Sequence, residues 1–145
     1  MTPCALRTVT TMASKGEFLS DLVVKDIDGD KWLLTAPLWY QQHGTLYIAP
    51  SGFVTDLASI PAVVFWRRKS GTHNEAAVIH DAGYAGQLIV DPHRVLSRED
   101  VDHLFRDGME ALGVSRWTRM VEFRVVRLCG WLPWNRYRKA EDAKT

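Results

Sequence analysis

The hydrophobic pattern changes its period along the chain, and this change constrains the fold more than any other feature. Between residues 18 and 48, short apolar runs rich in β-branched and aromatic residues are separated by turn residues. From Asn74 onward, apolar residues recur at spacings of three and four, which is typical of helices that bury one face. A β-region followed by helices predicts an α+β fold, with the helices segregated from a small sheet.

Two turn signals divide the predicted β-region into an antiparallel meander of three or four strands. The runs LVVKD and KWLLT flank residues 27–30 (IDGD), and Asp-Gly between β-forming residues is a strong hairpin signal. A second pair of β-runs surrounds His43-Gly44. The next segment, GFVTDLASIP, is predicted to be an ordered loop because its apolar residues can pack.

About three helices are expected in the second half of the chain. Each has a predicted N-cap residue: Asn74, Ser97 and Ser115. In the second helix, Asp100 resembles an acidic capping partner, and Gly113 is the predicted C-terminal cap. One apolar face of this helix is formed by Val101, Leu104, Phe105, Gly108, Met109 and Leu112. The first two helices are therefore expected to pack against each other as a pair.

The composition fits one globular domain. The chain has 145 residues, of which 46% are hydrophobic and 24% charged. We expect a flexible arm over residues 1–17, a single domain over residues 18–135 and a polar tail over residues 136–145. A formal net charge of +1 gives no electrostatic argument for nucleic acid, so no nucleic acid is predicted as a partner.

Neither cysteine pairing nor a membrane segment is expected. Cys4 and Cys129 are far apart and do not form a disulfide framework, so both are interpreted as free thiols. No apolar run approaches the roughly 18 residues needed to span a bilayer. The N-terminus lacks the continuous apolar stretch of a secretory signal.

The segment NEAAVIHDAGY carries the candidate functional residues. Residues four apart share a helix face, so Ala76, His80 and Tyr84 align. Asp81 points about 100° away from His80, so each of the two needs its own partner. If the helices pack antiparallel, Asp102 can orient His80 and direct its free nitrogen toward a water. With a cation held by Asp81, this predicts a hydrolytic site.

The sequence AAVIHDAGY followed by VDHLF resembles the signature of the phospholipases A₂, in particular their short bacterial, fungal and parvoviral forms. The resemblance covers about residues 74–109. It implies that His80 is the general base, Asp81 the calcium ligand and Asp102 the residue that orients His80. It also implies that Tyr84 helps to hold Asp102, and that the substrate is a lipid or a related ester of a membrane or cell envelope.

Two features depart from that family. Its glycine-rich calcium loop is not visible, and GFVTDLASIP stands in that place. Asp56 within this segment is therefore either a turn residue that caps its own loop or a second calcium ligand. The disulfides of the family are also absent, and a β-rich first half would have to replace them as the scaffold.

A second resemblance covers nearly the whole chain. The order of GF-TD-ASIP, AA-HD-Y, Ser97-Arg98 with Asp102 and Phe105, Gly113-Val114 and VVRLCGW is similar to a family of uncharacterised phage and prophage proteins with a domain of unknown function. This resemblance implies a phage setting among tail and lysis genes. Other virion proteins are then the expected partners, and the virion or the host cytoplasm is the expected location.

Each candidate residue also has a non-catalytic, structural interpretation. His80 and Asp81 can be a core histidine and a helix aspartate whose network only fixes helix packing, as in a non-catalytic tail protein. Ser59 lacks a nucleophile-elbow pattern and is interpreted as structural. A phosphohydrolase of the HD type would need further ligands on more helices. The remaining histidines of the second half are predicted at the surface: His73, His93 and His103.

The C-terminal sequence WLPWNRYRK leaves three interpretations open. Tryptophans beside Arg and Lys are typical of a membrane–water boundary. The same residues can end a helix whose tryptophans cap the core. They can also form an interaction surface in a larger assembly, where Trp, Tyr and Arg are enriched.

Overall fold

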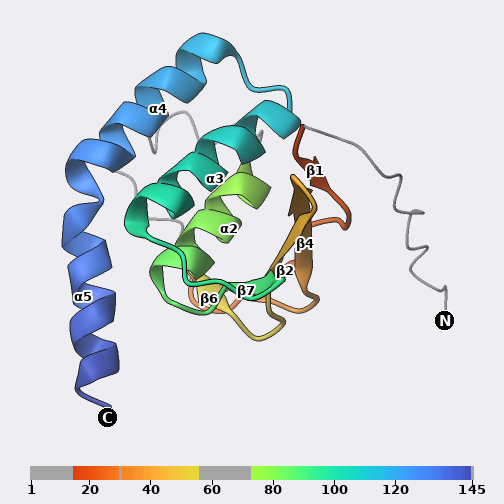
Figure 1. Cartoon of the computed structure of the whole chain (residues 1–145). Helices are drawn as coiled ribbons and strands as arrows, with labels where there is room; N and C mark the ends of the chain where they lie inside the picture. Colours follow the sequence, from red (N-terminus) through yellow and green to blue (C-terminus); the bar gives the residue numbers. More distant parts are fainter. Residues whose placement is uncertain (1–14, 30, 56–72, 145) are drawn as a thin grey trace, which may run out of the picture.

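Short antiparallel strands in the N-terminal half support a group of helices from the C-terminal half, which confirms the predicted α+β fold (Figure 1). The computed structural model describes residues 15–29, 31–55 and 73–144. One sheet has the order β1 (Glu17–Phe18), β4 (Leu38–Gln42), β5 (Thr45–Ala49) and β7 (Ile89–Asp91). The other has the order β2 (Val24–Asp26), β3 (Trp32–Leu34) and β6 (Val54–Thr55). The strands thus divide between two sheets, and β7 joins the first from between two helices.

Both predicted hairpins are present. Asp26 pairs with Trp32 at the end of the β2–β3 hairpin, and Asp26 Oδ1 accepts a hydrogen bond of 2.7 Å from the Gly29 amide within the turn. In the β4–β5 hairpin, Gln42 pairs with Thr45, so His43 and Gly44 form a two-residue loop. Their φ angles of 49° and 75° are both positive, as a type I′ turn requires.

The helices of the described chain are α2 (Asn74–Tyr84), α3 (Arg98–Ala111), α4 (Arg116–Cys129) and α5 (Trp131–Asp142). The predicted capping box of α3 is confirmed, because Ser97 and Asp100 bond reciprocally to each other's backbone amides. Gly113 follows α3 with a φ of 77°, in a Schellman arrangement of hydrogen bonds. The prediction for α2 was wrong by one residue: His73 is the N-cap, without a side-chain cap bond, and Asn74 is the first helical residue.

Helix α5 was not expected as a separate helix, since the sequence pattern placed its second half in a polar tail. Gly130 separates it from α4, and a Cβ at this glycine would collide with the Tyr84 hydroxyl. Pro133 lies in the first turn of α5, where a missing amide hydrogen costs no helical bond. The two helices run one after the other along an outer edge of the molecule (Figure 1).

Helix α2 lies at the centre of the molecule. Every residue from Ala76 to Tyr84 is buried, because α2 contacts α3, α5 and strands of both sheets. A Cβ on Gly83 would lie 2.6 Å from Val101 Cγ1, and one on Gly108 would lie 3.1 Å from the Ala76 Cβ. The end of α2 therefore meets the start of α3, and the two helices pack antiparallel. No described helix is long and apolar enough to cross a membrane.

Candidate functional site

Asp102 is the centre of a buried polar cluster between α2, α3 and α4. His80 Nε2 lies 3.0 Å from Asp102 Oδ1, and the Tyr84 hydroxyl donates to the same oxygen at 2.5 Å. Because a carboxylate only accepts, Nε2 carries the proton in its bond. Arg127 Nη1 donates to the second oxygen, Oδ2, at 2.9 Å, and Arg98 Nη1 lies 3.6 Å from that oxygen. The Asp102 carboxylate thus has donors on both oxygens.

The helix positions explain why these groups meet. His80 and Tyr84 are four residues apart on α2, and their ring centroids lie 4.1 Å apart. Phe105, three residues after Asp102 on α3, closes one side of the imidazole at a centroid distance of 5.1 Å. Trp134 of α5 packs edge-on against Tyr84 at 5.3 Å. Aromatic rings therefore surround the hydrogen-bonded couple and keep it away from water.

Asp81 faces a different partner from His80. Its Oδ2 accepts a hydrogen bond of 2.6 Å from the Thr55 hydroxyl on β6. Its Oδ1 lies 3.7 Å from His80 Nδ1, which is within ion-pair range but too long for a hydrogen bond. Neither of these two buried atoms has a hydrogen-bond partner among the described residues. His80 and Asp81 are thus each held by a separate residue, Asp102 and Thr55 respectively.

Hydrogen bonds and nearby charges together shift the pKa values of His80 and Asp102 more than burial shifts them in the opposite direction. Burial by itself would lower the pKa of His80, but its hydrogen bond to Asp102 and the nearby negative charges of Asp81 and Asp102 raise that pKa above its ordinary value. Burial would raise the pKa of Asp102, but the bonds from His80 and Tyr84, the His80 charge and Arg127 hold it below its usual range. The pKa of the Tyr84 hydroxyl is raised, first by burial and then by its bond to Asp102. His80 therefore holds a proton more tightly, and Asp102 less tightly, than the free side chains do.

The described residues do not fit a calcium ion. Calcium takes six to eight oxygen ligands, whereas Asp81 offers one free carboxylate oxygen and Asp102 has donors on both of its oxygens. Within residues 15–29, 31–55 and 73–144, no three His, Cys, Asp or Glu side chains are placed to hold a metal. Asp56, the other predicted ligand, lies outside the described residues, as does Ser59.

Comparison with known proteins confirms a domain of unknown function, the coarser part of the second resemblance. A family model described as a protein of unknown function, DUF1353, matches residues 32–126. This chain belongs to the DUF1353 family. No curated protein and no solved structure matches it. The part that matches the DUF1353 family includes His80, Asp81, Tyr84 and Asp102, whereas helix α5 lies beyond it.

The DUF1353 chain holds a second buried histidine–carboxylate pair that its sequence did not reveal. His73 Nε2 lies 3.3 Å from Glu122 Oε1, and the two side chains are 5% and 2% exposed. The predicted surface position of His73 is therefore wrong, because His73 is buried against Glu122 of α4. His93 is exposed and His103 is partly exposed, as predicted. A helical signal for Glu122 exists, since it lies four residues before the buried Val126 on the same face of α4.

Sequence reasoning also missed the cations around Asp102. Arg98 precedes Asp102 by four residues on α3, which is a recognisable ion-pair spacing. Arg127 and Thr55 reach the cluster from α4 and β6, and no local spacing relates them to α2 or α3. Their roles depend on tertiary packing alone.

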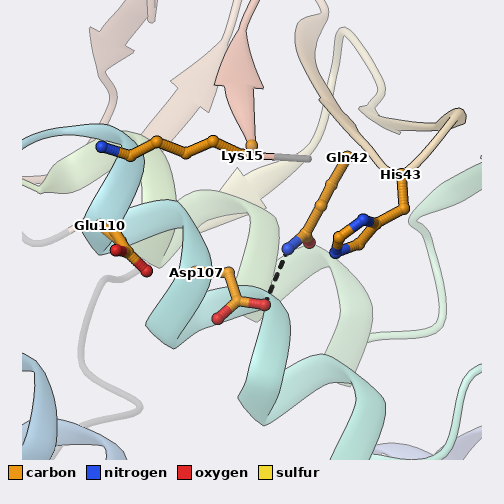
Figure 2. Close-up of a pocket in the computed structure, with 6 residues that line it drawn as sticks. Lys15, Gln42, His43, Asp107 and Glu110 are labelled. Carbon is orange, nitrogen blue, oxygen red and sulfur yellow. Dashed lines mark hydrogen bonds between the residues drawn. The ribbon is translucent and has the colours of Figure 1, made fainter. Parts of the chain in front are cut away.

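A polar cavity of about 330 Å³ lies elsewhere in the DUF1353 domain. It is lined by Lys15, Gly16, Gln42, His43, Asp107 and Glu110. Figure 2 shows Gln42 reaching from β4 toward α3, where its amide donates to Asp107 Oδ2 at 2.8 Å. The cavity shares no lining residue with the His80–Asp102 couple, so it is a separate feature of the surface.

Proposed function

We propose that this DUF1353 protein is a phage-encoded hydrolase, carried with the tail, that cleaves esters of host-envelope lipid. One observation carries the proposal: His80 Nε2 lies 3.0 Å from an Asp102 oxygen that also accepts from Tyr84. This arrangement fixes the imidazole tautomer, which is the role that a carboxylate plays beside a general base. The resemblance of the same residues to the phospholipase A₂ signature supports a lipid ester as the substrate.

In the proposed reaction, His80 Nδ1 is the atom that takes the proton. With Nε2–H bonded to Asp102, Nδ1 of the neutral ring removes a proton from water as the water oxygen attacks the ester carbonyl. Asp102 stabilises the imidazolium that forms. The ring then gives the proton to the leaving alkoxide, so that a carboxylic acid and an alcohol are released. Because His80 is 1% exposed, a neighbouring segment must move before substrate reaches Nδ1.

Release of fatty acid from phospholipid vesicles tests the proposal. We expect release by the wild-type chain and its loss in His80→Ala, measured with and without added calcium. His93→Ala is the matched control, because it removes an exposed histidine outside the cluster. Circular dichroism of both variants separates loss of the base from loss of the fold. No release by a folded wild-type chain from any of several lipids would contradict the proposal.

The burial of the cluster favours a second candidate, a non-catalytic tail component. Asp102 is 0% and Asp81 3% exposed, and such a network can serve only to fix helix packing. Mass spectrometry of purified particles tests this candidate. Stoichiometric presence in particles together with no ester hydrolysis supports it, whereas absence from particles contradicts it.

A further inference from the structure

The outer face of α4 and α5 is apolar although it is exposed. Trp117 is 69%, Leu128 75% and Trp131 52% exposed. Further exposed apolar side chains on the same two helices are Met120, Val121 and Leu132. In most soluble proteins such side chains are scattered singly, and a contiguous group marks an interaction surface.

These side chains lie on one side of α4 and in the first turn of α5, with the exposed Arg124 between the two apolar groups. At about 100° per residue, the α4 positions Trp117, Met120, Val121 and Leu128 fall within an arc of about 100°. Trp131 and Leu132 follow in the first turn of α5. The buried residues Glu122 and Val126 lie on the opposite side of α4. The stripe therefore faces away from the core. The helices α4 and α5 that carry it run along an outer edge of the molecule (Figure 1). We call these six residues, Trp117, Met120, Val121, Leu128, Trp131 and Leu132, the outer stripe.

Positive charge lies within and beside the outer stripe. Between residues 116 and 140 the basic residues are Arg116, Arg119, Arg124, Arg127, Arg136, Arg138 and Lys139, whereas the acidic residue in this stretch, Glu122, is buried. Four of the basic side chains are exposed and form no ion pair with a described residue: Arg116, Arg124, Arg136 and Lys139. Acidic side chains return only in the last turn of α5.

We propose that the outer stripe and its flanking basic residues dock on the surface of an anionic lipid bilayer. A helix with an apolar stripe, tryptophans and an excess of Arg and Lys fits the boundary between lipid headgroups and acyl chains. Each basic residue near an anionic membrane surface adds to the attraction. This inference goes beyond the proposed hydrolysis and does not depend on it.

Charge and side-chain chemistry disfavour two other partners for the outer stripe, a second copy of this chain and nucleic acid. A second copy of this chain docked through the same face would bring its unpaired cations together, because a twofold interface places equal surfaces against each other. Nucleic acid would satisfy the cations through its phosphates. It would leave the aliphatic side chains of Leu128, Val121 and Leu132 without an apolar partner. A lipid bilayer with anionic headgroups satisfies both kinds of side chain.

Co-sedimentation with vesicles tests the proposal on the full chain. We expect binding to vesicles of phosphatidylglycerol and phosphatidylethanolamine that is at least about tenfold tighter than binding to phosphatidylcholine vesicles. Trp117→Ser combined with Leu128→Ser should weaken binding by about tenfold or more, because two large side chains no longer insert. Arg124→Gln combined with Lys139→Gln should remove most of the preference for anionic lipid.

Ile27→Ser combined with Val95→Ser is the matched control, since both residues are exposed apolar side chains outside α4 and α5. This control should bind vesicles as the wild type does. Wild-type binding by the Trp117/Leu128 variant overturns the proposal. Tighter binding to duplex DNA than to anionic vesicles also overturns it, as does a wild-type dimer that the same variant makes monomeric.

Failure of docking and failure of hydrolysis can be told apart. His80→Ala should bind vesicles as the wild type does, since His80 is buried and is not part of the outer stripe. The Trp117/Leu128 variant should hydrolyse a water-soluble short-chain ester at the wild-type rate. Loss of vesicle binding in His80→Ala, with the fold intact, would assign the lipid surface to another part of the chain.

Discussion

At the scale of the residue, the stability of the buried polar cluster depends on Asp102. Its carboxylate is completely buried and accepts from His80, Tyr84 and Arg127. Removing it leaves the buried His80 and the partly exposed Arg127 without their anion. The cost of breaking a buried ionic network in this way exceeds that of an ordinary surface change by several kcal/mol.

We predict that Asp102→Ala lowers the free energy of unfolding by about 3–5 kcal/mol, measured by urea denaturation. Asp142→Ala is the control, because Asp142 is exposed in the last turn of α5 and should change stability by less than about 0.5 kcal/mol. Equal effects of the two substitutions would show that the buried network contributes little to stability.

The same couple predicts how stability depends on pH. The pKa of His80 is raised in the folded chain, so its contribution is complete below the unfolded value of about 6.5 and is lost as pH rises through the folded value. The pKa of Asp102 is lowered, so its contribution is present above about 3.9 and is lost as pH falls through the folded value. The urea concentration at the unfolding midpoint should therefore fall both toward acid pH and toward alkaline pH. His80→Gln should abolish the fall toward alkaline pH.

If His80 is a general base, its raised pKa also sets the pH dependence of the rate. Only the neutral ring accepts a proton, so kcat/KM should increase with pH along a limb whose midpoint lies above the ordinary histidine value of about 6.5. A pH–rate profile of vesicle hydrolysis measures this limb. A rate that is flat from about pH 5 to 9 would point to a different proton acceptor.

At the scale of the element, close packing between α2 and α3 depends on glycine. A Cβ at Gly83 would lie 2.6 Å from Val101 Cγ1, so Gly83→Ala must displace a side chain or a helix. We predict a loss of about 1–3 kcal/mol in thermal or urea unfolding.

Gly108→Ala is the matched control for this change. Its Cβ would lie 3.1 Å from that of Ala76, which a small shift can relieve, and both substitutions gain about 1 kcal/mol of helix propensity. The difference between the two variants therefore measures the contact with Val101. Equal stability of both would mean that α3 can move away from α2 freely.

The elements that could be predicted from sequence are those whose signals are local. Asp-Gly and His-Gly turns, the Ser97 capping box and the Gly113 cap each lie within a few residues, and all four are present. Strand β7 was missed because it pairs with β5, about forty residues earlier. Helix α5 was missed because its polar second half resembles a tail. The meeting of His80, Tyr84 and Asp102 follows from helix spacing, whereas Arg127 and Glu122 required the tertiary position of α4.

At the scale of the whole molecule, α5 connects the outer edge to the buried cluster. Trp134 is half-buried against Tyr84, whereas Trp131, three residues earlier, is 52% exposed. We predict that Trp134→Ala lowers stability by about 2 kcal/mol through lost aromatic packing. Trp131→Ala should change it by less than about 0.5 kcal/mol in the same urea titration. The reverse order would mean that α5 is anchored through its other face.

The complete burial of α2 has a consequence for the exchange of its backbone amides with solvent. A helix that is covered on every side cannot expose its hydrogen bonds while its neighbours stay in place, so its amides open only when α3, α5 and both sheets separate. In deuterated buffer, the amides from Ala77 to Tyr84 should be among the slowest to exchange. Their exchange rate then reports the global free energy of unfolding. The contribution of the Asp102 cluster to that free energy can therefore be measured by amide exchange in α2, without denaturant.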